Sequence, residues 1–205
     1  MAKALNETDE VWAQEFQRRG LEYRAPRLVF FDGSVSTSCG PASTEVGPFY
    51  CPGDQRIYFD LGFARQLQQL GVSGDYATVY IMAHEFAHHL QNVTGIGSQV
   101  RSAQQQAAGD ANKYSIAMEL QADCFAGVWG RMADDRGNVT VTAQEVREAQ
   151  DAARAVGDDR IQAGARQRVN PETWTHGSAA QRAQWYTTGF NSGDMDRCTT
   201  YAQIS

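Results

Sequence analysis

Residues 76–90 read YATVYIMAHEFAHHL, and this stretch decides the fold. Its apolar side chains fall on nearly every side of a helix, which predicts a helix buried in the core. Four polar side chains interrupt the run, namely His84, Glu85, His88 and His89. Burying such groups costs free energy unless they are paired or bind a metal ion. This conflict between local chemistry and burial makes the stretch the first candidate for a functional site.

The pentapeptide HEFAH, residues 84–88, has the HExxH spacing. Residues i and i+4 lie one turn apart on one helical face, so the imidazoles of His84 and His88 can reach the same zinc ion. Glu85 projects about 100° away, where it can take a proton from a zinc-bound water whose pKa is about 7. His89 points about 100° from His88 and is expected to miss the metal. Two ordinary core histidines are the alternative, because short motifs also arise by chance.

A second polar pair lies in the apolar helix predicted at residues 112–133. Glu119 and Asp123 are again four residues apart and share a helical face. A catalytic zinc site needs three protein ligands and one open position. One carboxylate can supply the third ligand, and the other can accept the free ring N–H of a ligating histidine. A solvated charged face is the alternative interpretation.

The remaining sequence predicts a small β element followed by helices. Residues 27–31 indicate a strand, residues 32–47 a loop, and residues 48–51 and 56–60 a hairpin. Further helices are expected at residues 8–20, capped by Thr8 or Asp9, and at 62–70. Capping boxes that begin at Thr142 and Ser178 predict helices up to about residues 156 and 188. A solvated helix or loop is expected at 98–111, and a short helix capped by Asp158 or Asp159. We see no repeat or composition break. The expected fold is therefore α+β and mostly helical, one domain over residues 1–205 with the zinc site between two core helices.

Composition argues against two other classes of protein. The net charge of −6 argues against binding nucleic acid, because neutralising phosphates requires a basic face. No stretch approaches the roughly 20 apolar residues that span a bilayer. Residues 1–26, a leading segment with a short helix, contain no apolar signal core. If the protein is exported or anchored, we expect this segment to follow a removed membrane anchor, which would be its sole contact with a membrane.

Four cysteines occur, and none forms a CxxC pair, which disfavours an all-cysteine zinc site. Three disulfide pairings are possible. We predict Cys39–Cys51, because the two residues flank one local loop, and this leaves Cys124–Cys198 as the second bond. Such bonds would place the protein in an oxidising compartment outside the cytoplasm. Four free thiols in a cytosolic protein are the alternative.

Several motifs, specific in combination, resemble the bacterial neutral zinc metallopeptidase family. They are HEFAHHLQ at residues 84–91, ELQADCFAGVWG at 119–130, CGP at 39–41, GPFYCP at 47–52, GDDRIQ at 157–162 and THGS at 175–178. The resemblance covers nearly the whole chain. The broader arrangement, HExxH with a downstream glutamate and an aspartate four residues later, is similar to that of the gluzincin peptidases.

The resemblance implies a zincin-like fold with one zinc ion per chain. It makes His84, His88 and Glu119 the metal ligands, Glu85 the base and Asp123 an outer partner of a ligand. It also implies hydrolysis of a peptide or protein substrate, outside the cytoplasm: in the periplasm, at the cell surface or after secretion. Two other functions stay open, a zinc-containing binding or scaffold protein without turnover and a zinc hydrolase of a non-peptide bond.

Peptide hydrolysis also needs a hydrogen-bond donor for the negative charge that develops on the carbonyl oxygen. His176 is our candidate, because it is the one histidine outside the HExxH helix and precedes a helix expected to begin after Ser178. In a closed structural zinc site, His176 would instead be the fourth ligand. Substitutes for the donor are Tyr50, Tyr58 and Tyr186, since a phenol can donate the same hydrogen bond.

Overall fold

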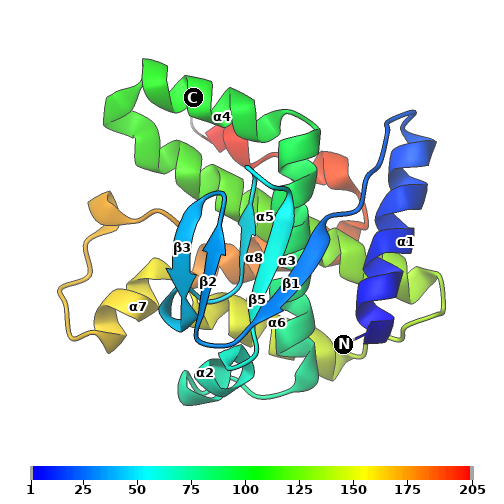
Figure 1. The fold of residues 1–205 in the computed structure, drawn as a ribbon, viewed down its shortest axis with the longest axis horizontal. Coiled ribbons are helices and arrows are strands. Elements are labelled where there is room, and N and C mark those ends of the chain that lie inside the picture. The colour runs from blue at the N-terminus through cyan, green and yellow to red at the C-terminus, as the bar shows by residue number, and fades with distance from the viewer. Residues whose placement is uncertain (1, 204–205) are drawn as a thin grey trace.

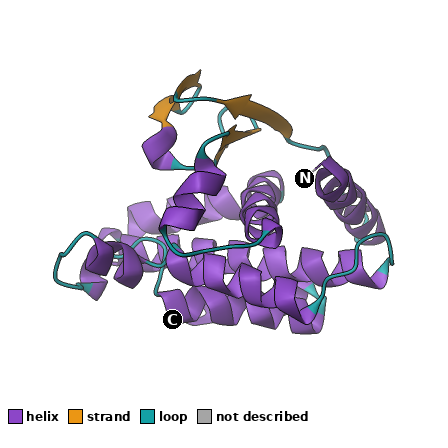
Figure 2. Ribbon diagram, turned by 90° about the horizontal axis from the view of Figure 1, so that it is seen from below, coloured by secondary structure: helices purple, strands orange, loops and turns teal. Residues whose placement is uncertain are grey.

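The computed structural model describes residues 2–203, with the side chains of residues 7–202. A small β layer lies on one side of a larger body of helices (Figure 2). The helices are α1 (Ala2–Arg18), α2 (Phe63–Gln69), α3 (Asp75–Val93), α4 (Ile96–Gln106), α5 (Ala111–Asp135), α6 (Ala143–Ala155), α7 (Asp158–Gly164) and α8 (Ala179–Ser192). The strands are β1 (Arg27–Phe31), β2 (Ser34–Thr37), β3 (Gly40–Ser43), β4 (Phe49–Cys51) and β5 (Arg56–Asp60). The predicted α+β, mostly helical architecture is confirmed.

The three-stranded sheet has the order β1-β5-β4 (Figure 1). β1 runs parallel to β5, whereas β4 and β5 form the predicted antiparallel hairpin. The strand expected at residues 27–31 is confirmed with the same bounds. The central strand β5 is buried from Ile57 to Asp60, so the sheet packs against the helices through β5 and leaves β4 at its edge. This edge position brings β4 next to α3.

The prediction of a loop over residues 32–47 was wrong in part. β2 and β3 form a short antiparallel hairpin within it, and a 3-10 turn follows at Thr44–Val46. The hydroxyl of Thr37 closes the hairpin, since it accepts from the amide of Cys39 and donates to the carbonyl of Gly40. Serine, threonine and glycine carry no alternating apolar signal, which is why the sequence does not reveal these strands.

Three helix boundaries also differ from the predictions. α1 begins at Ala2 instead of residue 8, and Thr8 is buried within the helix rather than capping it. The helix can continue through this polar stretch because the buried carboxylate of Glu7 accepts hydrogen bonds from Arg136 and Asn138. The residue that caps α7 is Gly157, not Asp158 or Asp159. α8 opens with the predicted capping box at Ser178 but continues to Ser192.

Two disulfides link separate elements of the chain. Cys39, at the turn between β2 and β3, is bonded to Cys51 at the end of β4, so this bond connects the two small sheets. Cys124 in α5 is bonded to Cys198, 74 residues later, which fixes the C-terminal segment to the centre of the helical body. Both pairings are those expected from the sequence. Within the described residues, none of the helices is both long and apolar enough to cross a membrane.

α5 and α8 approach until their backbones touch. A Cβ added to Gly127 of α5 would meet the carbonyl oxygen of Tyr186, and one added to Gly189 of α8 would meet the carbonyl oxygen of Cys124. Backbone atoms cannot move aside as the end of a flexible side chain can. Each helix therefore needs a glycine at the crossing.

We predict that Gly127→Ala and Gly189→Ala each lower the free energy of unfolding, by about 1–3 kcal/mol, because the added methyl group overpacks the crossing. Chemical denaturation followed by circular dichroism measures the change. Gly164→Ala is the matched control, since Gly164 ends α7 and has open space around its Cβ position. Equal stability of Gly189→Ala and Gly164→Ala would contradict the close backbone contact.

Candidate metal centre

The three predicted metal ligands lie together where α3 crosses α5. The Nε2 atoms of His84 and His88 are 3.1 Å apart. The Glu119 carboxylate lies 3.2 Å from Nε2 of His84 and 3.4 Å from Nε2 of His88. Donor atoms bound at about 2.0–2.1 Å around one tetrahedral zinc ion are about 3.3 Å apart. The spacing of these three side chains therefore fits a zinc ion.

The outer ring nitrogen of each histidine has its own acceptor. Nδ1 of His84 lies 2.8 Å from Oδ1 of Asp123, and Nδ1 of His88 lies 2.8 Å from Oε1 of Gln91. A neutral imidazole that donates from Nδ1 keeps its lone pair on Nε2. Both Nε2 lone pairs are then available to a metal ion that Glu119 would also bind.

Asp123 is fully buried and connects the three central helices. Besides His84, its carboxylate accepts from the hydroxyl of Tyr80 and from Nε and Nη2 of Arg182, at 2.8 and 3.0 Å for the guanidinium. Burial alone would raise the pKa of Asp123, but the positive charges of Arg182 and His84 hold it below its usual range. The carboxylate therefore stays ionised and fixes the orientation of the His84 ring.

The charges around the ligands favour a cation. Burial would lower the pKa of His84, yet the charge of Asp123 and the hydrogen bonds to Asp123 and Glu119 raise it to about 10. Burial would raise the pKa of Glu119, but the two neighbouring histidines lower it well below its usual value. Without a metal, a proton thus occupies His84. Burial would also lower the pKa of His88, but the neighbouring Glu119 charge raises it. A metal cation has to displace the proton of His84.

Glu85 lies beside these ligands in the wall of a cavity of about 510 Å³. Its side chain is 7% exposed, and burial raises its pKa above the usual value. A backbone hydrogen bond from Tyr50, in the edge strand β4, opposes that increase. A carboxylate with a raised pKa in the wall of a cleft is suited to accept and return a proton.

Apolar side chains form much of the rest of the same cavity. Three of them are more than half exposed: Val46 at 57%, Leu70 at 56% and Ile161 at 51%. They come from the 3-10 turn before β4, from the end of α2 and from α7. The cleft therefore has a polar floor at the histidines and an apolar rim.

His176 lines the cavity from the loop between α7 and α8. Its Nδ1 lies 3.1 Å from Oδ1 of Asp158, whose Oδ2 accepts from the backbone amides of Thr175, His176 and Gly177. Asp158 thus fixes both the loop and the imidazole, and leaves Nε2 of His176 free of that bond. Within the described residues, the group of side chains able to hold a metal consists of His84, His88 and Glu119, without His176.

His89 is fully buried and serves the contact between α3 and the sheet. Its Nε2 lies 2.6 Å from the carbonyl oxygen of Arg24, so Nε2 carries the proton and Nδ1 accepts from the hydroxyl of Tyr50 at 3.1 Å. Asn92 also donates to this hydroxyl. The hydroxyl proton of Tyr50 is therefore already given to His89.

The other two tyrosines named as substitute donors are also engaged or buried. The hydroxyl of Tyr58 donates to Asp54, and Tyr186 is 1% exposed in the core.

Sequence reasoning gave too little weight to three residues of this centre. Arg182 resembles an ordinary surface arginine in sequence, yet it is 3% exposed and bound to Asp123. Gln91 follows His88 by three residues, and this helical spacing was a usable signal for the hydrogen bond between them. Asp158 gives no such signal, because its contact with His176 joins two segments 18 residues apart.

Comparison with known proteins identifies the family. The family model described as "Putative neutral zinc metallopeptidase" matches residues 1–201. The uncharacterized protein YpfJ of Escherichia coli (strain K12) is 43% identical over 201 residues, which are 97% of this chain and 69% of YpfJ. The uncharacterized protein Rv2575 of Mycobacterium tuberculosis is 44% identical over 207 residues, covering 96% of this chain and 68% of Rv2575. No solved structure matches the chain. The chain therefore belongs to this zinc metallopeptidase family.

Proposed function

We propose that this protein is a zinc-dependent peptidase that binds one zinc ion per chain through His84, His88 and Glu119. The observation that carries the proposal is the convergence of two Nε2 atoms and one carboxylate within 3.1 to 3.4 Å of one another. Each Nδ1 is at the same time held by an outer acceptor. A zinc ion bound there would supply Lewis-acid activation of water and of a carbonyl group.

The neighbouring residues have distinct roles in this proposal. Glu85 accepts the proton of the attacking water and passes it to the leaving amine, which its raised pKa assists. Asp123 holds His84 in the tautomer that presents Nε2. His176, oriented by Asp158, donates from Nε2 to the oxygen of the scissile carbonyl as negative charge develops there.

An extended peptide is the substrate that fits the cleft. Strand β4 is the edge of its sheet, and its residues Phe49 and Tyr50 line the cavity. A peptide can add to such an edge through main-chain hydrogen bonds, which places its backbone along the floor that holds Glu85. The apolar rim can then receive a side chain of the same peptide. This arrangement favours peptide hydrolysis over a structural zinc site, which would need four protein ligands.

The two disulfides support a location outside the cytoplasm, where such bonds persist.

Digestion of a broad peptide library tests the proposed activity. We expect cleavage that a chelator abolishes and added zinc restores. Absence of cleavage by the zinc-loaded protein, with zinc bound at one ion per chain, would favour a binding protein instead.

Glu119→Ala should weaken zinc binding by more than about 100-fold, because it removes a ligand. Loss of a residue that only supports a ligand typically weakens metal binding by about 10–100-fold. Metal analysis after dialysis and competition with a chromogenic chelator measure the change. Glu172→Ala is the control, since Glu172 is an exposed glutamate of the same chain. Unchanged zinc affinity in Glu119→Ala would remove Glu119 from the ligands.

Zinc affinity of the wild type should fall as pH falls. The pKa of His84 is raised to about 10, so protons compete with zinc for the imidazole of His84.

Glu85→Gln should keep zinc and lose turnover. Glutamine preserves the size and the hydrogen bond from Tyr50 but cannot accept a proton, so we expect kcat to fall by about 10²–10⁴-fold. Zinc content and peptidase rate, measured on the same preparation, separate the two effects. Full activity of the zinc-loaded variant would exclude Glu85 as the base.

His176→Phe should lower kcat and kcat/KM together, by about 10²–10³-fold, with unchanged zinc content. The equal loss follows because the donated hydrogen bond forms in the transition state and not with bound substrate. A loss of zinc would instead identify His176 as a ligand of a closed site. No effect on rate or zinc would assign the donor to another residue.

A further inference from the structure

The amide of Gln91 is a second fixed support of the candidate metal site. Its side chain is 0% exposed, and Oε1 lies 2.8 Å from Nδ1 of His88. Nε2 of the same amide donates to the carbonyl oxygen of Met118 at 2.8 Å and to Oε1 of Gln121 at 3.0 Å. Both acceptors can bind only the NH₂ end, so the amide cannot turn over without losing two bonds. The oxygen of Gln91 is thereby kept towards His88.

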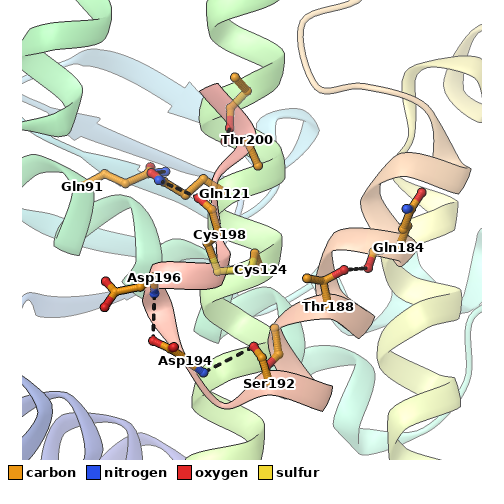
Figure 3. The surroundings of a disulfide bond; sticks show 12 residues. Gln91, Gln121, Cys124, Gln184, Thr188, Ser192, Asp194, Asp196, Cys198 and Thr200 are labelled. Carbon is orange, nitrogen blue, oxygen red and sulfur yellow. Dashed lines mark hydrogen bonds between the residues drawn. A yellow bond between two sulfur atoms is a disulfide. The ribbon is translucent and has the colours of Figure 1, made fainter. Parts of the chain in front are cut away.

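Gln121 connects this amide to the C-terminal segment. Its Nε2 donates to the carbonyl oxygen of Cys198 at 3.2 Å, which leaves its Oε1 to accept from Gln91. Figure 3 shows the side chains of Gln91 and Gln121 meeting beside Cys198. Gln121 is 7% exposed, so water has little access with which to replace these bonds. The orientation of both amides follows from where the Cys198 carbonyl lies.

The position of that carbonyl is fixed at two neighbouring points. The Cys198 side chain is bonded to Cys124, one helical turn after Gln121 on α5. The hydroxyl of Thr200 donates to the carbonyl oxygen of Ala117 at 2.6 Å, one turn before Gln121. Cys198 and Thr200 are both buried, at 3% and 2% exposure. The C-terminal segment is thus held against α5 on either side of Gln121.

We propose that Gln91 and Gln121 are positioning residues of the metal site, and that the Cys124–Cys198 disulfide supports His88 through them. The route is Cys198 carbonyl, Gln121 amide, Gln91 amide and His88 Nδ1; the first two hydrogen bonds are buried and the one at His88 is partly buried. The inference rests on the proposed zinc function. It adds a role for the C-terminal segment that lies outside the cleft: loss of the segment's anchor should loosen the hold on the metal.

The test measures zinc release from the full chain to an excess of chelator. Gln91→Met should weaken zinc binding by about 10–100-fold, the usual effect of removing the partner of a ligating histidine. Gln121→Met should act in the same direction by about 10-fold, at the lower end of that range, because Gln91 keeps its bond to Met118. The double variant Cys124→Ala/Cys198→Ala should accelerate release as well. Combined with Gln121→Met, it should add little, since both changes interrupt one route.

Gln104→Met is the matched control, because Gln104 also bridges two segments through its amide but contacts Ala111 and Ser115, away from the ligands. Gln91→Glu should recover part of the zinc retention relative to Gln91→Met, since a carboxylate still accepts the proton of His88 but loses the donations to Met118 and Gln121. NMR of the His88 Nδ1–H resonance provides a readout that general destabilisation would not move. This resonance should shift in Gln121→Met and not in Gln104→Met.

Unchanged zinc release and an unchanged His88 resonance in Gln121→Met would overturn the inference. If Gln121→Met does not fold, the Cys124→Ala/Cys198→Ala variant releases the same segment, and unchanged zinc release in that variant has the same meaning. A wild type that binds no zinc would refute the proposed function itself. Zinc bound through Glu119 but insensitive to Gln121 and to the disulfide would refute this inference alone.

Discussion

The structure depends on one buried carboxylate, that of Asp123. An ionised group without water is stable only when charges and hydrogen bonds compensate it. Tyr80 and His84 of α3 and Arg182 of α8 provide that compensation for Asp123 of α5. The need to satisfy this carboxylate therefore determines how three helices are arranged. Removing one partner of such a pair typically costs about 3–5 kcal/mol, because it leaves the other charge buried and unpaired.

Close packing makes this interaction possible. Arg182 and Gly189 lie on the face of α8 that meets α5, and Gly127 follows Asp123 by one turn on α5. Because the glycines let the two backbones touch, the guanidinium reaches Asp123 within the core. The same crossing presents Glu119, one turn earlier on α5, to the histidines of α3. Tight helix packing and the geometry of the candidate metal centre thus have a common origin.

The two histidines differ in the groups that hold their Nδ1 atoms. His84 is held by a charged network that reaches α8, whereas His88 is held by neutral amides that reach the C-terminal segment. On the opposite side, His89 and Tyr50 attach the edge strand β4 to α3. α3 therefore carries the two histidines of the proposed site and also places the sheet edge along the cleft. Glu85 lies between these parts, where burial raises its pKa.

The sequence alone predicted what depends on short-range periodicity. The buried helix, the i,i+4 pairs His84/His88 and Glu119/Asp123, the β4–β5 hairpin and the capping boxes at Thr142 and Ser178 all follow from the spacing of neighbouring residues. Such features are visible because helices and strands repeat every few residues. The HExxH spacing also indicated zinc, and the family resemblance extended this interpretation to the peptidase activity that we propose.

Only the tertiary structure decided the contacts between distant segments. The pairing of Arg182 with Asp123 spans 59 residues, and that of Gln121 with Cys198 spans 77. Nothing in the local sequence distinguishes Arg182 from an arginine in solvent, since its burial depends on glycines in two helices. The β2–β3 hairpin likewise formed from serine, threonine and glycine, where backbone hydrogen bonds and a disulfide replace apolar alternation. The sequence determined which side chains could bind a metal; the packing of α3, α5 and α8 decided which polar groups hold them, because burial requires every charge and amide to find a partner.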